Sequence, residues 1–129
     1  MFALSQSMSW EVRIRRGTVR IESPSRGVLI ASFRGMCGEE HVAAATRLLD
    51  QWIDEGLEVV VAIDSRDLGG AEPGYRRSWS AWLKAHGRHV RRVEVLPRPN
   101  TYGARAAGRV RRHASALSFT VAVAEAAAA

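Results

Sequence analysis

The sequence predicts an α/β domain with a mainly parallel sheet of about four or five strands, three covering helices and an antiparallel hairpin at the N-terminus. Two observations predict this class. Four short apolar runs have the composition of buried strands, and segments with helical periodicity lie between them. Strands that alternate with helices in this way form parallel sheets with the helices packed on their faces. The runs are Val28–Phe33, Leu57–Ile63, Arg92–Leu96 and Leu117–Val123.

The segment before these runs alternates between apolar and polar residues. The alternation covers Trp10–Ile14 and, after Arg16-Gly17, residues 18–22. It predicts a hairpin with one face on the core and one in water. Residues 23–27 contain proline and glycine, and predict the turn into the first apolar run. The apolar face of the first strand would consist of Trp10, Val12 and Ile14.

Two helices are well marked. Glutamates open Glu39–Glu55, where negative charge is favourable at the positive end of the helix dipole, and Gly56 is a plausible stop. The polar residues 64–72 predict a connection, after which Pro73 suits the first turn of Pro73–Ala85, with Gly87 at its end. The predicted buried stripes are Val42, Ala45, Leu49, Trp52 and Ile53, and then Tyr75, Trp79, Trp82 and Leu83.

A third helix is predicted from about Thr101 to His113, with a thin apolar stripe. We expect residues 1–9 to be a flexible N-terminus, residues 10–123 to be a single domain and residues 124–129 to be an Ala-rich tail. A chain of 129 residues can bury a real core without metal or disulfide staples.

Composition and charge indicate where the protein is located and what kind of partner it could bind. No run approaches the ~20 apolar residues that span a bilayer, and the N-terminus is a poor secretory signal. Cys37 is the single cysteine, so it makes no internal disulfide, and these features together predict a cytoplasmic protein. The net charge is +6. The half from residue 65 onward holds 12 basic and 4 acidic residues, which is +8 and suits an anionic partner or a solvated face.

No catalytic, cofactor or metal site is predicted. Cys37 lies near a predicted helix start with His41 four residues on, the setting of a reactive thiol, but a buried inert thiol is the simpler interpretation. His86 and His89 would need Asp64 or Asp67 to hold a metal, and no strong third ligand is implied. The glycines at 69 and 70 lack the motif context of a nucleotide loop.

A basic face is the main binding candidate. Its residues are spaced along the third predicted helix and the strand before it, and would neutralise phosphates. The segment has a single aromatic residue, so base stacking is not supported and nucleic acid is not the favoured partner. The face consists of Arg105, Arg109, Arg112, Arg91 and Arg92.

The order of elements from Thr18 to Val123 resembles the STAS fold of bacterial sporulation anti-sigma factor antagonists, and more closely the related SpoIIAA-like branch. The segments that carry the resemblance are VLIASFRG, EEHVAAATRLLDQWIDEG, VVVAIDSRDLGG and RRVEVLPRP. The resemblance implies a non-enzymatic domain that binds partner proteins, often switched by phosphorylation of Ser or Thr at the start of the second helix. Here the matching residues 70–74 carry no hydroxyl, and Ser65 and Ser78 are only remote candidates.

We therefore expect a cytoplasmic, non-catalytic regulatory module that binds a protein partner and uses no cofactor. One alternative is anion or nucleic-acid binding through the basic face. Another is an apolar, lipid-like ligand beneath the second helix, because SpoIIAA-like domains are similar in fold to lipid-carrier domains. A homodimer through the N-terminal hairpin is a further alternative, since an amphipathic edge strand can pair with its twin. An exposed Trp10 could anchor a partner or a dimer, but core packing is the simpler interpretation of this residue.

Overall fold

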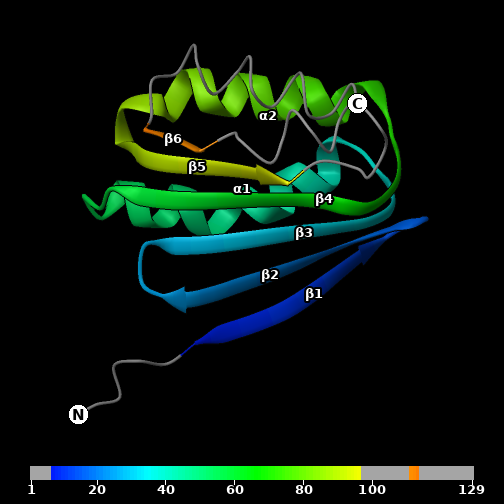
Figure 1. The fold of residues 1–129 in the computed structure, drawn as a ribbon, viewed down its shortest axis with the longest axis horizontal. Helices are drawn as coiled ribbons and strands as arrows, with labels where there is room; N and C mark the ends of the chain where they lie inside the picture. Colours follow the sequence, from blue (N-terminus) through cyan, green and yellow to red (C-terminus); the bar gives the residue numbers. More distant parts are fainter. Residues whose placement is uncertain (1–6, 97–110, 114–129) are drawn as a thin grey trace.

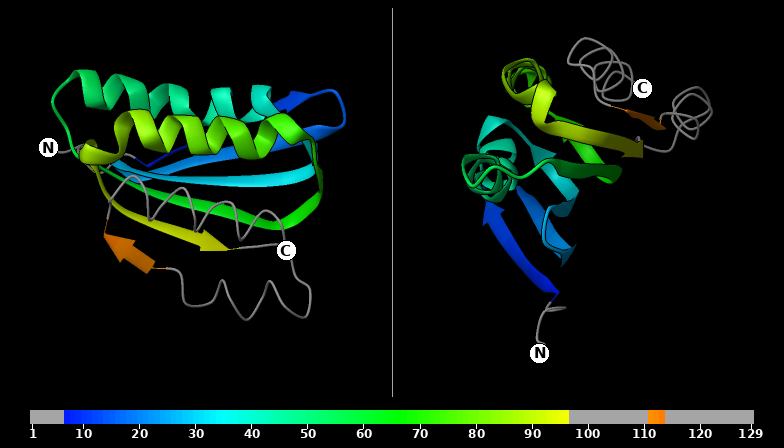
Figure 2. Two further views of the ribbon diagram at one scale, coloured as in Figure 1. Left: turned by 90° about the horizontal axis from the view of Figure 1, so that it is seen from above. Right: turned by 90° about the vertical axis from the view of Figure 1, so that its left-hand side faces the viewer.

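Two helices lie on one face of a mixed β-sheet (Figures 1 and 2) in the computed structural model, which describes residues 7–96 and 111–113. The α/β class predicted from the sequence is confirmed. The elements in chain order are β1 (Met8–Ile14), β2 (Gly17–Ser25), β3 (Val28–Cys37), α1 (Glu39–Asp54), β4 (Val59–Ala71), α2 (Pro73–His86), the 3₁₀ turn η2 (Gly87–His89), β5 (Val90–Leu96) and β6 (Arg111–His113).

The strands follow the order β1-β2-β3-β4-β5-β6 across the sheet. Only β3–β4 and β4–β5 are parallel, and the other three neighbouring pairs are antiparallel. The expectation of a mainly parallel sheet was therefore wrong. The short turns on either side of β2 force antiparallel neighbours, whereas the crossovers through α1 and α2 allow parallel ones.

The predicted third helix is only partly testable. Its residues 101–110 and the predicted strand Leu117–Val123 lie outside the described residues, as do residues 1–6 and 124–129. Its last three residues, Arg111–His113, form β6 and pair antiparallel with β5, so the helix does not reach His113. Unpaired backbone at the edge of β5 favours another strand there more strongly than the thin apolar stripe favours a helix.

The first hairpin forms as predicted, with Trp10, Val12 and Ile14 on one face of β1. β1 and β2 pair without a register shift from Met8↔Ser23 to Ile14↔Gly17, around a two-residue turn at Arg15 and Arg16. Gly17 is required by a close approach: a Cβ there would lie 2.8 Å from His41 Nε2 and 2.9 Å from Cys37 Sγ. The hairpin therefore seats closely against the N-terminal end of α1.

Strand β4 is longer than predicted. Residues 64–71 were expected in a connection, but they continue the strand because β3 also runs on to Cys37 and supplies partners, such as Arg34↔Asp67 and Cys37↔Ala71. Two irregularities in the register allow this paired extension to bend. Backbone pairing with β3 therefore makes this segment a strand, although its polar composition is typical of a connection.

The core lies between the sheet and the two helices. Trp52, Trp79 and Trp82 are buried, as predicted. Phe33 meets Tyr75 and Trp79 edge to face, with ring centroids 5.2 and 6.1 Å apart. The indole N–H of Trp82 donates to Asp50 at 2.7 Å and joins α2 to α1. Helix α1 ends before Gly56, which has a φ of +89° as its predicted role requires.

Candidate interaction site at the first strand and first helix

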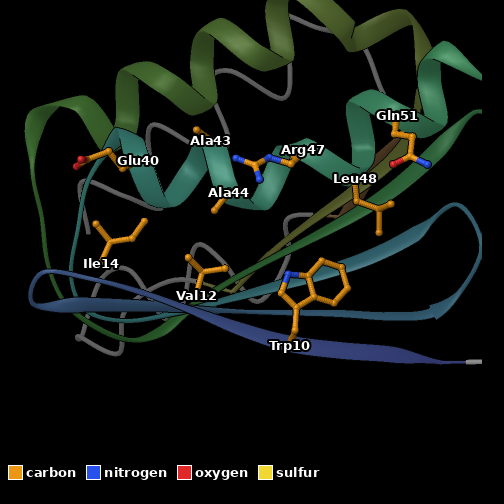
Figure 3. Close-up of a pocket in the computed structure, with 9 residues that line it drawn as sticks. All are labelled: Trp10, Val12, Ile14, Glu40, Ala43, Ala44, Arg47, Leu48 and Gln51. Carbon is orange, nitrogen blue, oxygen red and sulfur yellow. The ribbon is translucent and has the colours of Figure 1, made fainter.

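An apolar groove of about 650 Å³ runs between β1 and α1 near the open edge of the sheet (Figure 3). Side chains of β1 form one wall and one flank of α1 forms the other, as the labelled sticks in Figure 3 show. We call it the β1–α1 groove, and it is lined by Trp10, Val12, Ile14, Glu40, Ala43, Ala44, Arg47, Leu48 and Gln51.

The β1 wall follows from the alternation of a strand. Trp10, Val12 and Ile14 are two residues apart and share the face toward the helices, as predicted. Trp10 is 37% exposed, whereas Val12 and Ile14 are half-buried. Large aromatic side chains that remain this exposed are frequent anchors of protein interfaces.

The α1 wall follows from helical spacing. Ala43, Ala44 and Leu48 lie beside the buried stripe of α1, so the apolar face of this helix extends beyond what the sheet covers. Glu40, Arg47 and Gln51 complete this wall with polar groups. The buried stripe was predicted from the sequence, but this flank was not; the signal for it was the small Ala43-Ala44 pair next to the stripe.

Two links hold the hairpin against α1 at the Ile14 end of the groove. Arg15 forms ion pairs with Glu40 and with Glu72, the latter at 3.3 Å, and the hydrogen bond that Arg15 donates to the Glu40 carboxylate raises the pKa of Arg15. His41, which is 1% exposed, accepts the Gly38 N–H on Nδ1 and donates from Nε2 to the Ile14 carbonyl, both at 3.0 Å. These contacts fix the spacing of the two walls.

Within the described part of the chain, the two helices cover fewer strands than the sheet contains, and this leaves the groove uncovered. Figure 2 shows α1 and α2 side by side over the middle of the sheet, with β1 at the lower border of the view along the strands. Within the described residues β1 pairs only with β2. One edge of β1 and one of its faces are therefore both uncovered by these elements.

Cys37 sits in an environment that keeps its thiol protonated. It is fully buried, and its Sγ lies 3.5 Å from the Arg34 carbonyl oxygen. Burial raises the pKa of Cys37 to about 11. His41 uses both ring nitrogens in the structural bonds described above. The two residues weighed from the sequence as a reactive thiol and its helper, with an inert thiol as the simpler interpretation, therefore have the environments of a core thiol and a capping histidine.

The candidate metal ligands lie at different ends of the sheet. The Nδ1–H of His86 donates to the Trp82 carbonyl oxygen at 3.0 Å, and the His86 ring stacks on the Trp82 ring. It lies with His89 at the start of β5, whereas Asp64 pairs with the last residue of β5. Among the described residues no three His, Cys, Asp or Glu side chains gather in a way that would hold a metal ion.

Asp64 is engaged by its neighbour Arg66. Partial burial opposes ionisation of Asp64, but hydrogen bonds from the Arg66 side chain at 2.8 and 3.0 Å prevail and lower the pKa of Asp64. The remote phosphorylation candidates are also placed. Ser65 is 3% exposed and shares a hydrogen bond of 3.0 Å with the Tyr75 hydroxyl, while Ser78 is half-buried on α2.

The predicted basic face is only partly described. Arg105 and Arg109 lie outside the described residues. Arg112 is in β6 opposite Val93, and Arg91 and Arg92 are exposed on β5.

The structure adds a basic surface that the sequence analysis missed. Residues 73–93 contain no acidic residue, and exposed basic side chains follow α2 and its 3₁₀ extension. The absence of acidic residues around the second predicted helix could have indicated this surface from the sequence. We call this set the α2 basic surface: Arg76, Arg77, Lys84 and Arg88.

Comparison with known protein families and with curated proteins gave no match to this chain. Within residues 7–96 and 111–113, neither helix has the length and apolar character needed to cross a membrane.

Proposed function

We propose that this chain is a non-catalytic, STAS-like protein-interaction module that contacts its partner through the β1–α1 groove. The observation that carries the proposal is the pairing of an apolar groove with an exposed Trp10 at an open sheet edge. Open edges and partly exposed aromatic side chains are recurrent features of docking surfaces. The environments of Cys37 and His41 further support a role without covalent chemistry.

The groove has the size and chemistry of a peptide or protein contact. A volume of about 650 Å³ also suits a small ligand, but the groove is open along the β1 edge, and polar side chains of α1 line part of it. Residues beneath α2, where the sequence suggested a lipid-like ligand, are packed: Trp79 and Leu83 are fully buried. A free, buried cysteine also suits the reducing conditions of the cytoplasm, where we propose the module works.

A photo-crosslinking experiment tests this function. A benzophenone amino acid replaces Ala43 in the groove or, as the matched control, Ala81 on the exposed side of α2, in cells that express the full chain. We expect a protein adduct from position 43 that is absent from position 81 and is lost when Trp10→Asp is added. Equal adducts at both positions, or none at 43, would refute the proposal. Native mass spectrometry that finds a stoichiometric apolar ligand in the purified chain would favour the small-molecule alternative.

The α2 basic surface supports a second candidate function, binding of an anionic partner. Arg77, Lys84 and Arg88 are seven and then four residues apart, so they lie along one side of the helix and its extension. Titration with single-stranded DNA and polyphosphate at 50 and 200 mM salt tests it. Binding that weakens steeply with salt and is lost in Arg77→Glu/Lys84→Glu supports it. Absence of binding at the lower salt removes it.

A further inference from the structure

Within the described residues the outer edge of β1 is unpaired, and it lacks three of the features that normally protect an edge strand: a very short length, a proline and a bulge. β1 has seven residues, contains no proline or glycine, and pairs with β2 without a bulge. Charged side chains also protect edges, but Glu11 and Arg13 of β1 carry opposite signs and can therefore pair with each other across two copies of the strand. Met8 and Trp10, 45% and 37% exposed, lie along it. The outer edge of β1 can therefore form backbone hydrogen bonds with an added strand.

The hairpin register decides which backbone groups are available. In a two-residue hairpin the residues that flank the turn, here Ile14 and Gly17, form a hydrogen-bonded pair, and such pairs then alternate along the ladder. The N–H and C=O groups of Trp10 and Val12 consequently point toward β2. Those of Ser9, Glu11 and Arg13 point outward, where an added strand would meet them.

The charges on β1 complement themselves when the strand is reversed. Glu11 and Arg13 flank Val12 and project from the face opposite the groove. In an antiparallel pair of two β1 strands centred on Val12, Glu11 of each copy stands opposite Arg13 of the other. Opposite charges directly across an antiparallel pair are favourable, and like charges are unfavourable.

The neighbouring registers are disfavoured by the same residues. A shift by one residue would place the two helix layers on opposite faces and mismatch the outward backbone groups. The two symmetric registers that keep the faces place Glu11 opposite Glu11 or Arg13 opposite Arg13. Centring on Val12 is therefore the register that satisfies both the backbone groups and the charges.

We infer that the occupant of the β1–α1 groove is a second copy of this chain, which joins by antiparallel β1–β1 pairing about a two-fold axis at Val12. The inference rests on the proposed interaction function and names the partner. On the groove face, Val12 meets Val12 of the second copy and Trp10 stands opposite its Ile14. The two sheets become one continuous sheet, and the α1 helices face each other across the joined strands.

Charge reversal tests the pairing. Sedimentation velocity of the wild-type chain from 1 µM to 1 mM should show a concentration-dependent dimer. Glu11→Arg or Arg13→Glu alone turns both inter-chain pairs repulsive and should raise the dissociation constant about tenfold or more. Glu58→Arg, which makes the same charge change as Glu11→Arg at an exposed site away from β1, should leave the dissociation constant unchanged.

Variants that restore the Glu11–Arg13 charge pairs between copies distinguish a loss of dimer contacts from a loss of folding. Glu11→Arg/Arg13→Glu should recover the dimer, and a mixture of the two single variants should form a mixed dimer more tightly than either associates alone. Failure of both restorations, with circular dichroism spectra like that of the wild type, would overturn the inference. A wild-type chain that stays monomeric at 1 mM would overturn it as well. The proposed function would survive that result if position 43 still captured a different protein.

Cysteine trapping tests the register. Val12→Cys places two thiols at a non-hydrogen-bonded pair, where Cα atoms are about 4.5 Å apart, within disulfide range. Glu11→Cys and Arg13→Cys place them diagonally, about 7–8 Å apart, beyond easy bridging. Val12→Cys should therefore oxidise to a covalent dimer fastest, and buried Cys37 should not compete. Faster trapping at position 11 or 13, or none at 12, would refute the Val12-centred dimer.

Discussion

His41 joins the hairpin to α1, and its replacement gives a quantitative test of the packing that shapes the groove. The ring bridges the Gly38 N–H and the Ile14 carbonyl, each at 3.0 Å, and is 1% exposed. His41→Leu would fill similar space but leave both backbone groups without this partner. An unpaired buried polar group costs about 1–3 kcal/mol. The Ile14 carbonyl is only partly buried, so its loss of a partner costs less than that of a fully buried group. We therefore expect a loss of about 2–4 kcal/mol in the free energy of unfolding.

His41→Gln is the matched control. A glutamine at the third helical position commonly accepts the N–H of the N-cap residue, here Gly38, and its amide nitrogen can donate toward Ile14. We expect it to cost about 1 kcal/mol or less, the scale of an altered cap. Urea unfolding followed by tryptophan fluorescence measures both variants. If His41→Leu is as stable as the wild type, or if His41→Gln is no better than His41→Leu, the bridging role assigned to His41 is wrong.

Three further predictions concern other parts of the described fold. Because burial raises its pKa to about 11, the Cys37 thiol should react with a disulfide reagent at pH 7.5 many times more slowly in the native chain than in urea; equal rates would refute its burial. Trp79→Ala should cost about 3–5 kcal/mol in unfolding free energy, whereas Trp10→Ala should cost about 1 kcal/mol or less in the monomer; similar losses would contradict their assigned environments. The pKa of Asp64 is lowered in the folded state, so its bond to Arg66 stabilises the fold above its unfolded pKa near 3.8 and loses this effect as pH falls through the lower folded pKa. Arg66→Ala should therefore reduce stability more at pH 7 than at pH 2, and an equal loss at both would refute this linkage.

Residues with strong periodicity were placed correctly from the sequence. The alternation around Val12 indicated both strand and face, and the helical spacing of Trp79 and Leu83 indicated burial. These predictions succeed because local pattern and tertiary packing favour the same structure. Gly56 was also a reliable stop, since its left-handed conformation is a local property.

Features set by distant partners were not predictable in the same way. The polar segment around Asp67 became strand because β3 pairs with it, and nothing local indicated that partner. The groove also depends on where α1 lies relative to β1, which the sequence does not state. Ala43 and Ala44 carried a weak signal, because small residues beside a buried stripe suit either solvent or a partner.

Amide hydrogen exchange along β1 tests the antiparallel β1–β1 pairing most directly, because this pairing would cover the outward backbone groups of Glu11 and Arg13. We predict that the Glu11 and Arg13 amides exchange rapidly in dilute protein and slow as concentration rises, while the Trp10 and Val12 amides, which face β2, are protected throughout. Rates at Glu11 and Arg13 that do not depend on concentration or on added partner, or new protection on α2 instead, would contradict the account.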